Sequence, residues 1–324
     1  MGCPAGIGPE IILRHFEQTP ENSAVRAVVL GDTAVLKRCR KELGSRMDIT
    51  PWMPGTSLPA NSIPVIEISS LPENSFNWGE PNHSTADAMA AYIQKGVEFI
   101  KKGWLDGITT CPISKEALND AGYEFPGHTE MLAHLTASEN FAMMMSGSRL
   151  KVTLVTIHCP LSEVPAMMSI PRILRLIQIT HRALKIDFAI DKPRIAVAGL
   201  NPHGGENQLF GSEEIHAISP AVSRSQSNGI DVSGPYPPDT VFFKAARGDF
   251  DAVVCMYHDQ GLIPFKLLHF NDGVNVTLGL PIVRTSVDHG TAYDIAGKGV
   301  ASPESLSEAV KLAVEICRNR QNNF

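Results

Sequence analysis

Three histidines in this sequence each follow a short apolar segment and stand beside a turn. The segments run over 151–157, 194–200 and 252–256, and the histidines are His158, His203 and His258. Imidazole is a good ligand for divalent metals, and three protein ligands beside one open position form a catalytic arrangement. If the segments are parallel strands, their carboxyl ends lie at the sheet edge where open α/β folds bind ligands. A single such histidine is more commonly a hydrogen-bonded structural residue, but three at matching positions favour a shared metal site.

A second group of residues is suited to binding an anion. Gly127-His128-Thr129-Glu130 opens an expected helix with Thr129 as its N-cap, so backbone N–H groups there are free to meet a phosphate or carboxylate. Three further polar residues stand near apolar strand segments and together could hold a phosphate and a carboxylate: Lys266, Asn275 and Arg284. The alternative for each is an ordinary capped helix start or a surface side chain.

A third feature is the polar, glycine-containing segment 288–299, DHGTAYDIAGKG, which a helical pattern follows. Such a loop could cradle a nucleotide, although its glycine spacing alone is weak evidence. No G-x-G-x-x-G follows an expected strand, and the pair Gly6 and Gly8 lacks the third glycine, so a Rossmann cofactor site is not supported.

These residues have to be positioned by an alternation of strands and helices, which indicates βαβ units and a largely parallel sheet covered on both faces. We expect strands at 27–31, 65–68, 107–110, 151–157, 194–200, 252–256 and 274–278, and helices at 83–102, 129–135, 170–184, 213–227 and 303–317. The glycine-rich segment 2–10 is a turn that feeds a helix, and such a turn normally follows a strand. Either a strand upstream of Met1 is absent from this sequence or the fold does without it.

Composition sets limits on partners and location. A net charge of −6 argues against nucleic acid or an anionic membrane as the main partner. The six cysteines include no C-x-x-C pair and suit reduced thiols; Cys159, beside His158, is a fourth candidate ligand, but its side chain would point the opposite way on an extended backbone. No apolar run approaches the roughly 18 to 20 residues that span a bilayer, and no secretory signal is apparent. We expect a cytoplasmic protein.

Five segments resemble the 4-hydroxythreonine-4-phosphate dehydrogenase family of vitamin B6 (pyridoxal phosphate) biosynthesis. They are PAGIGPE (4–10), PGHTE (126–130), NPHGGE (201–206), YHDQGL (257–262) and GVNVTLGLPIVRTSVDHGTAYDIAGKG (273–299). They extend over nearly the whole chain, and the last two are the most specific. The segment 288–299 also resembles the cofactor-binding loop of the isocitrate and isopropylmalate dehydrogenases, with which the family shares its fold.

The resemblance implies two α/β/α lobes with the active site in the cleft between them. We expect residues 1–127 with 285–324 to form the first lobe, which carries the cofactor loop, and residues 128–284 to form the second, which carries the metal ligands and dimer contacts. The resemblance also implies a homodimer in which both subunits contribute metal ligands. It assigns the metal to His158, His203 and His258, the substrate to His128, Thr129, Lys266, Asn275 and Arg284, and NAD or NADP to His289, Gly290 and Asp294.

The reaction that the resemblance implies is NAD(P)-linked oxidation of the carbon-3 hydroxyl of 4-phosphohydroxy-L-threonine, followed by decarboxylation to 3-amino-2-oxopropyl phosphate. A divalent metal, zinc or alternatively cobalt or magnesium, would stabilise the developing alkoxide. A base must take the hydroxyl proton; Asp239 is the first candidate and Lys266 the second. Lys115 is a further candidate for the cleft, with a solvated helix-start lysine as the alternative.

The chain departs from the family pattern at Cys3, where family members carry aspartate, and in the strand expected before it. Related branches act on threonate 4-phosphate or on dihydrodiols, and the motifs do not separate the phosphorylated substrates. Two other functions stay open: a three-histidine metal hydrolase or lyase, and a non-catalytic protein with a decayed site. Neither the metal nor the choice between NAD and NADP follows from the sequence.

Overall fold

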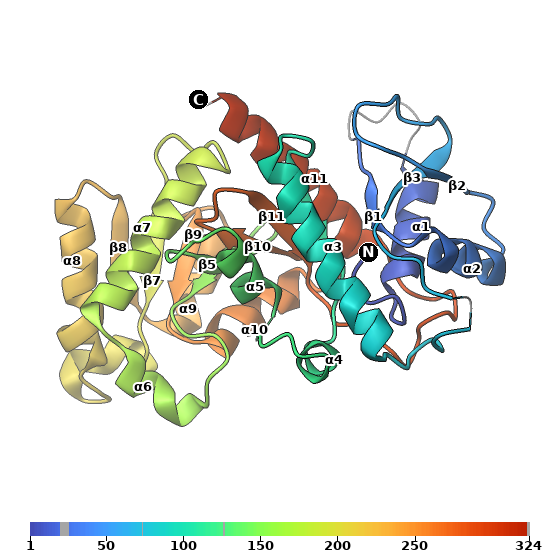
Figure 1. The fold of residues 1–324 in the computed structure, drawn as a ribbon. Helices are drawn as coiled ribbons and strands as arrows, with labels where there is room; N and C mark the ends of the chain where they lie inside the picture. Colours follow the sequence, from blue (N-terminus) through green and yellow to red (C-terminus); the bar gives the residue numbers. More distant parts are fainter. Residues whose placement is uncertain (20–25, 73, 126, 323–324) are drawn as a thin grey trace. The chain divides into compact units, whose positions relative to one another are not determined.

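The computed structural model describes residues 1–19, 26–72, 74–125 and 127–322 (Figure 1). Pro126 of the PGHTE segment lies outside these ranges. The contacts group into two compact units, Met1–Ser138 with Pro281–Val314, and Glu139–Leu280 with the chain from Glu315 onward. We expected the first segment of the first lobe to end before His128. The first unit instead continues to Ser138, because the helix that His128 begins packs within it.

The first unit contains two groups of parallel strands. One is a three-stranded sheet in the order β1-β3-β2, formed by β1 (Val29–Gly31), β2 (Asp48–Pro51) and β3 (Ser62–Glu67). The other is the parallel pair of β4 (Gly107–Thr110) and β11 (Val283–Val287). The helices of this unit include α1 (Gly8–Gln18), α2 (Thr33–Leu43), α3 (His83–Lys101), α4 (Lys115–Asp120), α5 (His128–Leu135) and most of α11 (Glu304–Asn322).

Local signals explain where these helices begin and end. The Asp32 carboxylate accepts hydrogen bonds from the N–H groups of Ala34 and Val35, which caps α2, and Gly44 ends that helix with a φ of 65°. A reciprocal capping box between Asn82 and Thr85 begins α3.

The second unit is built on six strands in the order β10-β5-β6-β9-β7-β8. Its helices include a short π-helical turn, Glu214–Ile218, that leads into α8. The strands are β5 (Ala142–Ser146), β6 (Lys151–Leu154), β7 (Ile195–Ala198), β8 (Val232–Tyr236), β9 (Ala252–Cys255) and β10 (Val274–Leu278), and the helices are α6 (Val164–Met167), α7 (Ile170–Ile186), α8 (Ser219–Ser227), α9 (Pro238–Ala246) and α10 (His258–Leu268).

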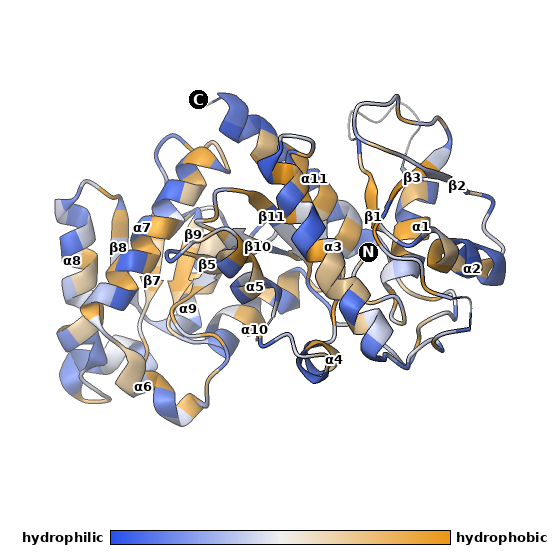
Figure 2. Ribbon diagram, in the orientation of Figure 1, coloured by the Kyte–Doolittle hydropathy of each residue, from blue (hydrophilic) through white to orange (hydrophobic). Residues whose placement is uncertain are grey.

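The core of this unit is made by apolar side chains of its inner strands. Val152, Leu154, Ala196 and Val253 are buried together with Phe265 of α10. Figure 2 shows the inner strands in hydrophobic colours, whereas α7 and α8 carry polar residues along part of their length. The sheet thus gains its stability from apolar burial.

The α/β class that the sequence indicated is confirmed, and so is a central part of the topology. The strands expected to precede the three histidines, β6, β9 and β7, lie side by side and run parallel. The sheet of this unit is largely parallel, as expected, with one exception: β5 runs antiparallel to both β6 and β10. Four strands were not expected: β2, β5, β8 and β11.

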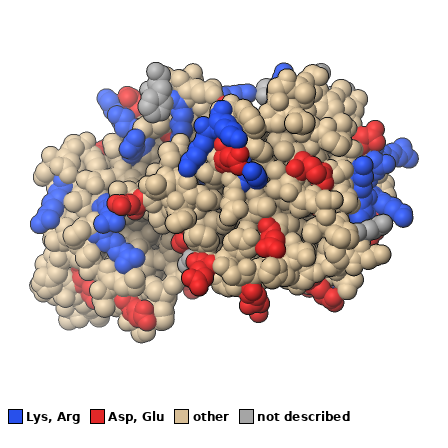
Figure 3. Space-filling model, in the orientation of Figure 1, with Lys and Arg blue, Asp and Glu red and all other residues tan. Residues whose placement is uncertain are grey.

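Residues 1–7 form a turn and contain no strand, and α1 follows directly. The Cys3 N–H donates to the Pro112 carbonyl at 2.8 Å, and the Gly79 N–H donates to the Ala5 carbonyl at 2.7 Å. All six cysteines are free thiols, as expected. Among the residues described, no helix is both long and apolar enough to cross a membrane. On the face seen in Figure 3, Lys and Arg side chains are interspersed with Asp and Glu.

Candidate active site

His158 and His258 lie together at the carboxyl edge of two neighbouring parallel strands. His158 follows β6, and His258 is the first residue of α10, which comes shortly after β9. The centroids of their rings are 5.9 Å apart. Because β6 and β9 are paired in register, two histidines placed soon after their ends are brought to the same side of the sheet edge.

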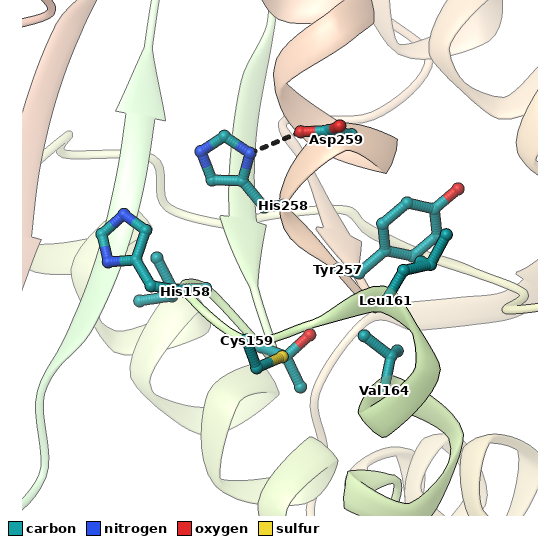
Figure 4. A pocket seen from close by; sticks show the side chains of 9 residues that line it. His158, Cys159, Leu161, Val164, Tyr257, His258 and Asp259 are labelled. Atoms are coloured by element: carbon teal, nitrogen blue, oxygen red, sulfur yellow. Dashed lines mark hydrogen bonds and ion pairs between the residues drawn. The ribbon is translucent and has the colours of Figure 1, made fainter.

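Asp259 orients the His258 ring. The His258 Nδ1 and Asp259 Oδ1 atoms are 2.7 Å apart, a distance suited to an Nδ1–H that donates to the carboxylate, and in this tautomer of the neutral ring Nε2 has the lone pair. Figure 4 shows this second nitrogen on the side of the ring that faces His158. A carboxylate that holds the second ring nitrogen of a histidine is the usual support of a metal-ligating imidazole.

The two histidines line a pocket of about 260 Å³. Tyr257, Leu161 and Val164 line the pocket on the side away from His158 (Figure 4). Cys159 also lines the pocket. Sequence reasoning identified both histidines but did not recognise Asp259 as the support of His258, although a carboxylate directly after a candidate ligand was a signal for it.

His203 does not join this pair within the chain. It lies in the 3₁₀ segment Pro202–Gln208 after β7, where its ring neighbours Phe210 with a centroid separation of 6.2 Å. Its φ of 53° is left-handed, as are those of the following residues through Gln208. This run turns the segment away from the line of the strand. Adjacent strands therefore bring two of the three histidines together, and among the described residues His203 does not complete a three-ligand group with them.

A divalent metal fits the two histidines that the chain assembles, because two imidazoles that line one pocket are a suitable donor pair for Zn²⁺ or a related ion. Over the described part of the chain, no set of three His, Cys, Asp or Glu side chains is placed to hold a metal. A third protein ligand would therefore have to be supplied in addition to His158 and His258.

The candidate bases and two of the substrate residues are also in the second unit. Asp239 is exposed in the first turn of α9, the helix that packs against the His203 segment. Lys266 is on α10, with its Nζ 5.9 Å from the centroid of the Phe270 ring. Asn275 is partly buried in β10. The residues that line the histidine pocket do not include these three.

The remaining substrate residues form an electropositive cluster in the first unit. His128 begins α5, and its Nε2 atom is buried and makes no hydrogen bond. Burial, together with the positive charge of Arg284 and Lys115, holds the pKa of His128 well below its usual range. Thr129, the N-cap that we expected, is inside α5; Gly127 is the N-cap and supplies no side-chain bond.

Arg284 is the buried cation of this cluster. It is 3% exposed on β11, and its Nη2 donates to Thr110 Oγ1 of β4 at 2.8 Å. Burial lowers the pKa of its guanidinium to about 10, which still leaves it charged at neutral pH. A buried positive charge beside a buried histidine nitrogen with no partner is an arrangement that an anionic ligand would complete.

The expected cofactor loop is held against the start of the chain. The Ile7 N–H donates to the Thr291 carbonyl at 3.1 Å, and Gly299 and Ala301 donate backbone N–H groups to the buried Glu10 carboxylate. His289, Gly290 and Asp294 are all exposed on this loop. The loop is thus anchored at both ends while its three expected cofactor residues face solvent.

Comparison with known proteins gives one consistent result. Residues 23–313 match the family model described as pyridoxal phosphate biosynthetic protein PdxA. The 4-hydroxythreonine-4-phosphate dehydrogenase of Desulforapulum autotrophicum is 52% identical over 315 residues, which are 97% of this chain and 93% of that protein.

Two further matches are a relative with a different name and a crystal structure. A protein of Oceanobacillus iheyensis, provisionally named D-threonate 4-phosphate dehydrogenase, is 43% identical over 320 residues, 98% of this chain and 96% of its own. The crystal structure of 4-hydroxythreonine-4-phosphate dehydrogenase from Klebsiella pneumoniae is similar with a TM-score of 0.89 and 41% identity, covering 98% of both chains.

Proposed function

The chain belongs to the family of the pyridoxal phosphate biosynthetic protein PdxA, and we propose that it is a metal-dependent, NAD(P)-linked 4-hydroxythreonine-4-phosphate dehydrogenase. In the proposed reaction, the carbon-3 hydroxyl of 4-phosphohydroxy-L-threonine is oxidised by NAD(P)⁺. The β-keto acid loses CO₂, and the products are 3-amino-2-oxopropyl phosphate and NAD(P)H. The observation that carries the proposal is the His158–His258 pair, at the ends of adjacent parallel strands in a chain so similar to named dehydrogenases.

We assign the metal to His158 and His258 of one chain. The Asp259 carboxylate supports this assignment, because its hydrogen bond leaves the His258 Nε2 atom available as a ligand. A bound divalent metal would supply Lewis-acid stabilisation of negative charge that develops on oxygen. His203 is the third proposed ligand, and it is assigned to a second copy of the chain because no three-ligand group forms among the described residues of one chain.

A homodimer is supported by an exposed apolar face in the second unit. Ile263, Leu267 and Phe270 follow one another on and just after α10 and are 67%, 84% and 76% exposed. Large apolar side chains exposed along one helix face are typical of a surface that another protein covers. Because α10 begins at His258, a second copy bound there would lie close to the proposed metal site. Leu209 and Phe210, which follow the His203 segment, are exposed as well.

The electropositive cluster of the first unit is assigned to an anionic group of the substrate. The buried guanidinium of Arg284 can form paired, charge-assisted hydrogen bonds to a phosphate or carboxylate. His128 stays neutral at physiological pH because its pKa is lowered, so it adds a hydrogen bond and no further charge. Thr129, Lys266 and Asn275 complete the proposed substrate contacts.

Asp239 is the proposed base that takes the hydroxyl proton, with Lys266 as the alternative. Asp239 is exposed on a helix that packs against the His203 segment, so it and His203 would reach a shared site from the same chain. The loop 288–299 is proposed to hold NAD or NADP through His289, Gly290 and Asp294, which its anchored ends leave exposed. Bound NAD(P)⁺ would accept the hydride. A cytoplasmic location is proposed because the cysteines suit reduced thiols and the sequence shows no apparent secretory signal.

A D-threonate 4-phosphate dehydrogenase is the alternative activity, favoured by the relative of that provisional name. A panel of phosphorylated hydroxy acids, assayed with both NAD and NADP, tests the proposal. We expect the highest kcat/KM for 4-phosphohydroxy-L-threonine and loss of turnover when the phosphate is removed from the substrate. A higher kcat/KM for threonate 4-phosphate would transfer the assignment to that substrate. Turnover without nicotinamide would favour a metal hydrolase or lyase instead.

A further inference from the structure

Gln260 connects the ends of the two strands that lead to His258 and His203. It is on the first turn of α10 and is 6% exposed. Its Oε1 accepts from the Met256 N–H, and its Nε2 donates to the Gly199 carbonyl, each at 2.6 Å. Met256 directly follows β9 and Gly199 directly follows β7. Only a carboxamide offers an acceptor and a donor at these two positions at once, so glutamine is specifically suited to this place.

Glu214 holds the next residues of the second segment. It is 3% exposed, and its Oε1 accepts from the backbone N–H groups of Leu200 and Asn201 at 2.8 and 2.7 Å. Its Oε2 accepts from the Asn201 side chain at 3.0 Å. A buried carboxylate is costly unless its oxygens are satisfied, and here backbone and amide N–H groups satisfy both. Gly205 lies against the same carboxylate, because a Cβ there would be 2.7 Å from Oε2.

The segment between these contacts is conformationally unusual. His203, Glu206, Asn207 and Gln208 all have positive φ angles although none is glycine. Such a run persists only where the surrounding structure holds it. Gln260 and Glu214 supply buried side-chain contacts that hold its start, beside the Gly199 N–H bond to the Tyr236 carbonyl and the Asn201 side-chain bond to Glu213. The position of His203 therefore depends in part on these two side chains.

We propose that Gln260 and Glu214 are positioning residues for the metal site. Gln260 fixes the spacing between the His258 turn and the start of the His203 segment, and Glu214 fixes the direction in which that segment leaves the sheet. Neither side chain needs to touch a metal or substrate. The role in metal binding rests on the proposed function, whereas the effect on the His203 segment does not.

The variant Gln260→Met tests the proposal, because methionine has a similar length and removes both hydrogen bonds. Its matched control is Gln226→Met, which removes a glutamine side-chain bond to the Val232 carbonyl, remote from the histidine segments. Hydrogen exchange of the metal-free protein is followed in peptides that cover 199–208. We expect exchange to become at least about tenfold faster in Gln260→Met, because two buried hydrogen bonds are lost, and to stay unchanged in the control. Unchanged exchange in Gln260→Met would overturn the proposal.

Cobalt binding provides the readout that a purely structural role would not change. At a temperature where the variant is fully folded, we expect Co²⁺ affinity about 10 to 100 times weaker than in the wild type, with an altered d–d absorption spectrum. Faster exchange with an unchanged cobalt affinity and spectrum would overturn the positioning role. The variant His258→Ala, measured in parallel, is expected to bind cobalt far more weakly. If it does not, the proposed metal site is wrong. The exchange result still decides whether Gln260 holds the His203 segment in place.

Asn201→Ala gives a second test if Gln260→Met does not fold. It removes only the side-chain bonds of Asn201 to Glu213 and Glu214 and leaves Gln260 in place. We expect faster exchange in 203–208 and an altered cobalt spectrum. Wild-type exchange and spectrum in this variant would contradict a positioning role for the contact between Glu214 and the Asn201 side chain.

Discussion

The Nδ1 atom of His258 lies 2.7 Å from Oδ1 of Asp259, its neighbour in sequence and the second residue of α10. The hydrogen bond fixes one tautomer of the ring, because the proton between these atoms must be on nitrogen when the carboxylate is ionised. His158 then faces a ring whose free nitrogen is an electron-pair donor (Figure 4). Asp259 therefore determines whether the pair is suited to a metal, although it need not contact one.

Asp259→Asn is expected to weaken metal binding about 10- to 100-fold, because the amide no longer draws the Nδ1 proton of His258 as a carboxylate does. The measurement is competition for Zn²⁺ or Co²⁺ against a chromophoric chelator. Asp272→Asn is the matched control, since Asp272 supports the Nδ1 atom of His269 at 3.0 Å in the same way but away from the pocket. Equal losses of affinity in the two variants would contradict a specific role for Asp259.

Mixing two inactive variants tests whether His203 acts across a dimer. His203→Ala and His258→Ala are each expected to lack activity. If His258 of one copy and His203 of the other complete one site, a mixed dimer contains one intact site. Random reassociation should then restore about a quarter of the wild-type turnover. If all ligands come from a single chain, the mixture stays inactive.

Leu267→Asp is expected to separate the dimer and to remove metal and activity together, because it places a charge on the most exposed apolar position of α10. Sedimentation and metal content are the measurements. Met53→Asp is the control, since Met53 is an exposed apolar residue of the first unit, 71% accessible and distant in sequence from α10. An active, fully metallated monomer of the Leu267 variant would refute the shared site.

The sequence predicted the strands that lead to the histidines, because β-branched runs such as 151–157 are bounded by turn residues and carry their signal locally. It did not predict that β5 pairs antiparallel with β6, since pairing direction depends on contacts far apart in sequence. The left-handed run that contains His203 was not foreseen for the same reason. Glu214 and Gln260 hold the start of this run of left-handed residues, and the residues of the segment NPHGGE give no sequence signal for either contact.

His128 was found from a helix-start motif, but its buried, unpartnered Nε2 atom was not predictable, because burial depends on tertiary contacts and the nearby charge of Arg284 comes from a strand that was not expected. Thr129 was expected to cap the helix, yet the N-cap is Gly127, two residues earlier, and the helix begins at His128. Helix ends are the least certain part of any pattern, since neighbouring residues compete for the cap.

The lowered pKa of His128 makes a prediction about stability. Burial, and then the charge of Arg284, keep the folded-state pKa below the unfolded value of about 6.5, so only the unfolded chain gains this proton as the pH falls. The stabilisation is present above pH 6.5 and is lost below it, by up to about 1.4 kcal/mol per pH unit.

Urea unfolding at about pH 7.5 and 5.5 measures this linkage. Wild type is expected to lose roughly 1 kcal/mol more than His128→Gln over this interval. His134→Gln, on the same helix, should lose as much as wild type. A His128→Gln protein whose stability falls in parallel with the wild type would show that His128 is not held neutral by the fold.

The most direct test of the proposed enzyme is metal-dependent formation of NAD(P)H and CO₂ from 4-phosphohydroxy-L-threonine, measured for the wild type and for His258→Ala. We predict equal amounts of the two products with the wild type, and at least about a thousandfold lower kcat/KM for the variant. Absence of turnover by a folded, metallated wild-type protein with this substrate and with threonate 4-phosphate would contradict the account. So would full activity of His258→Ala.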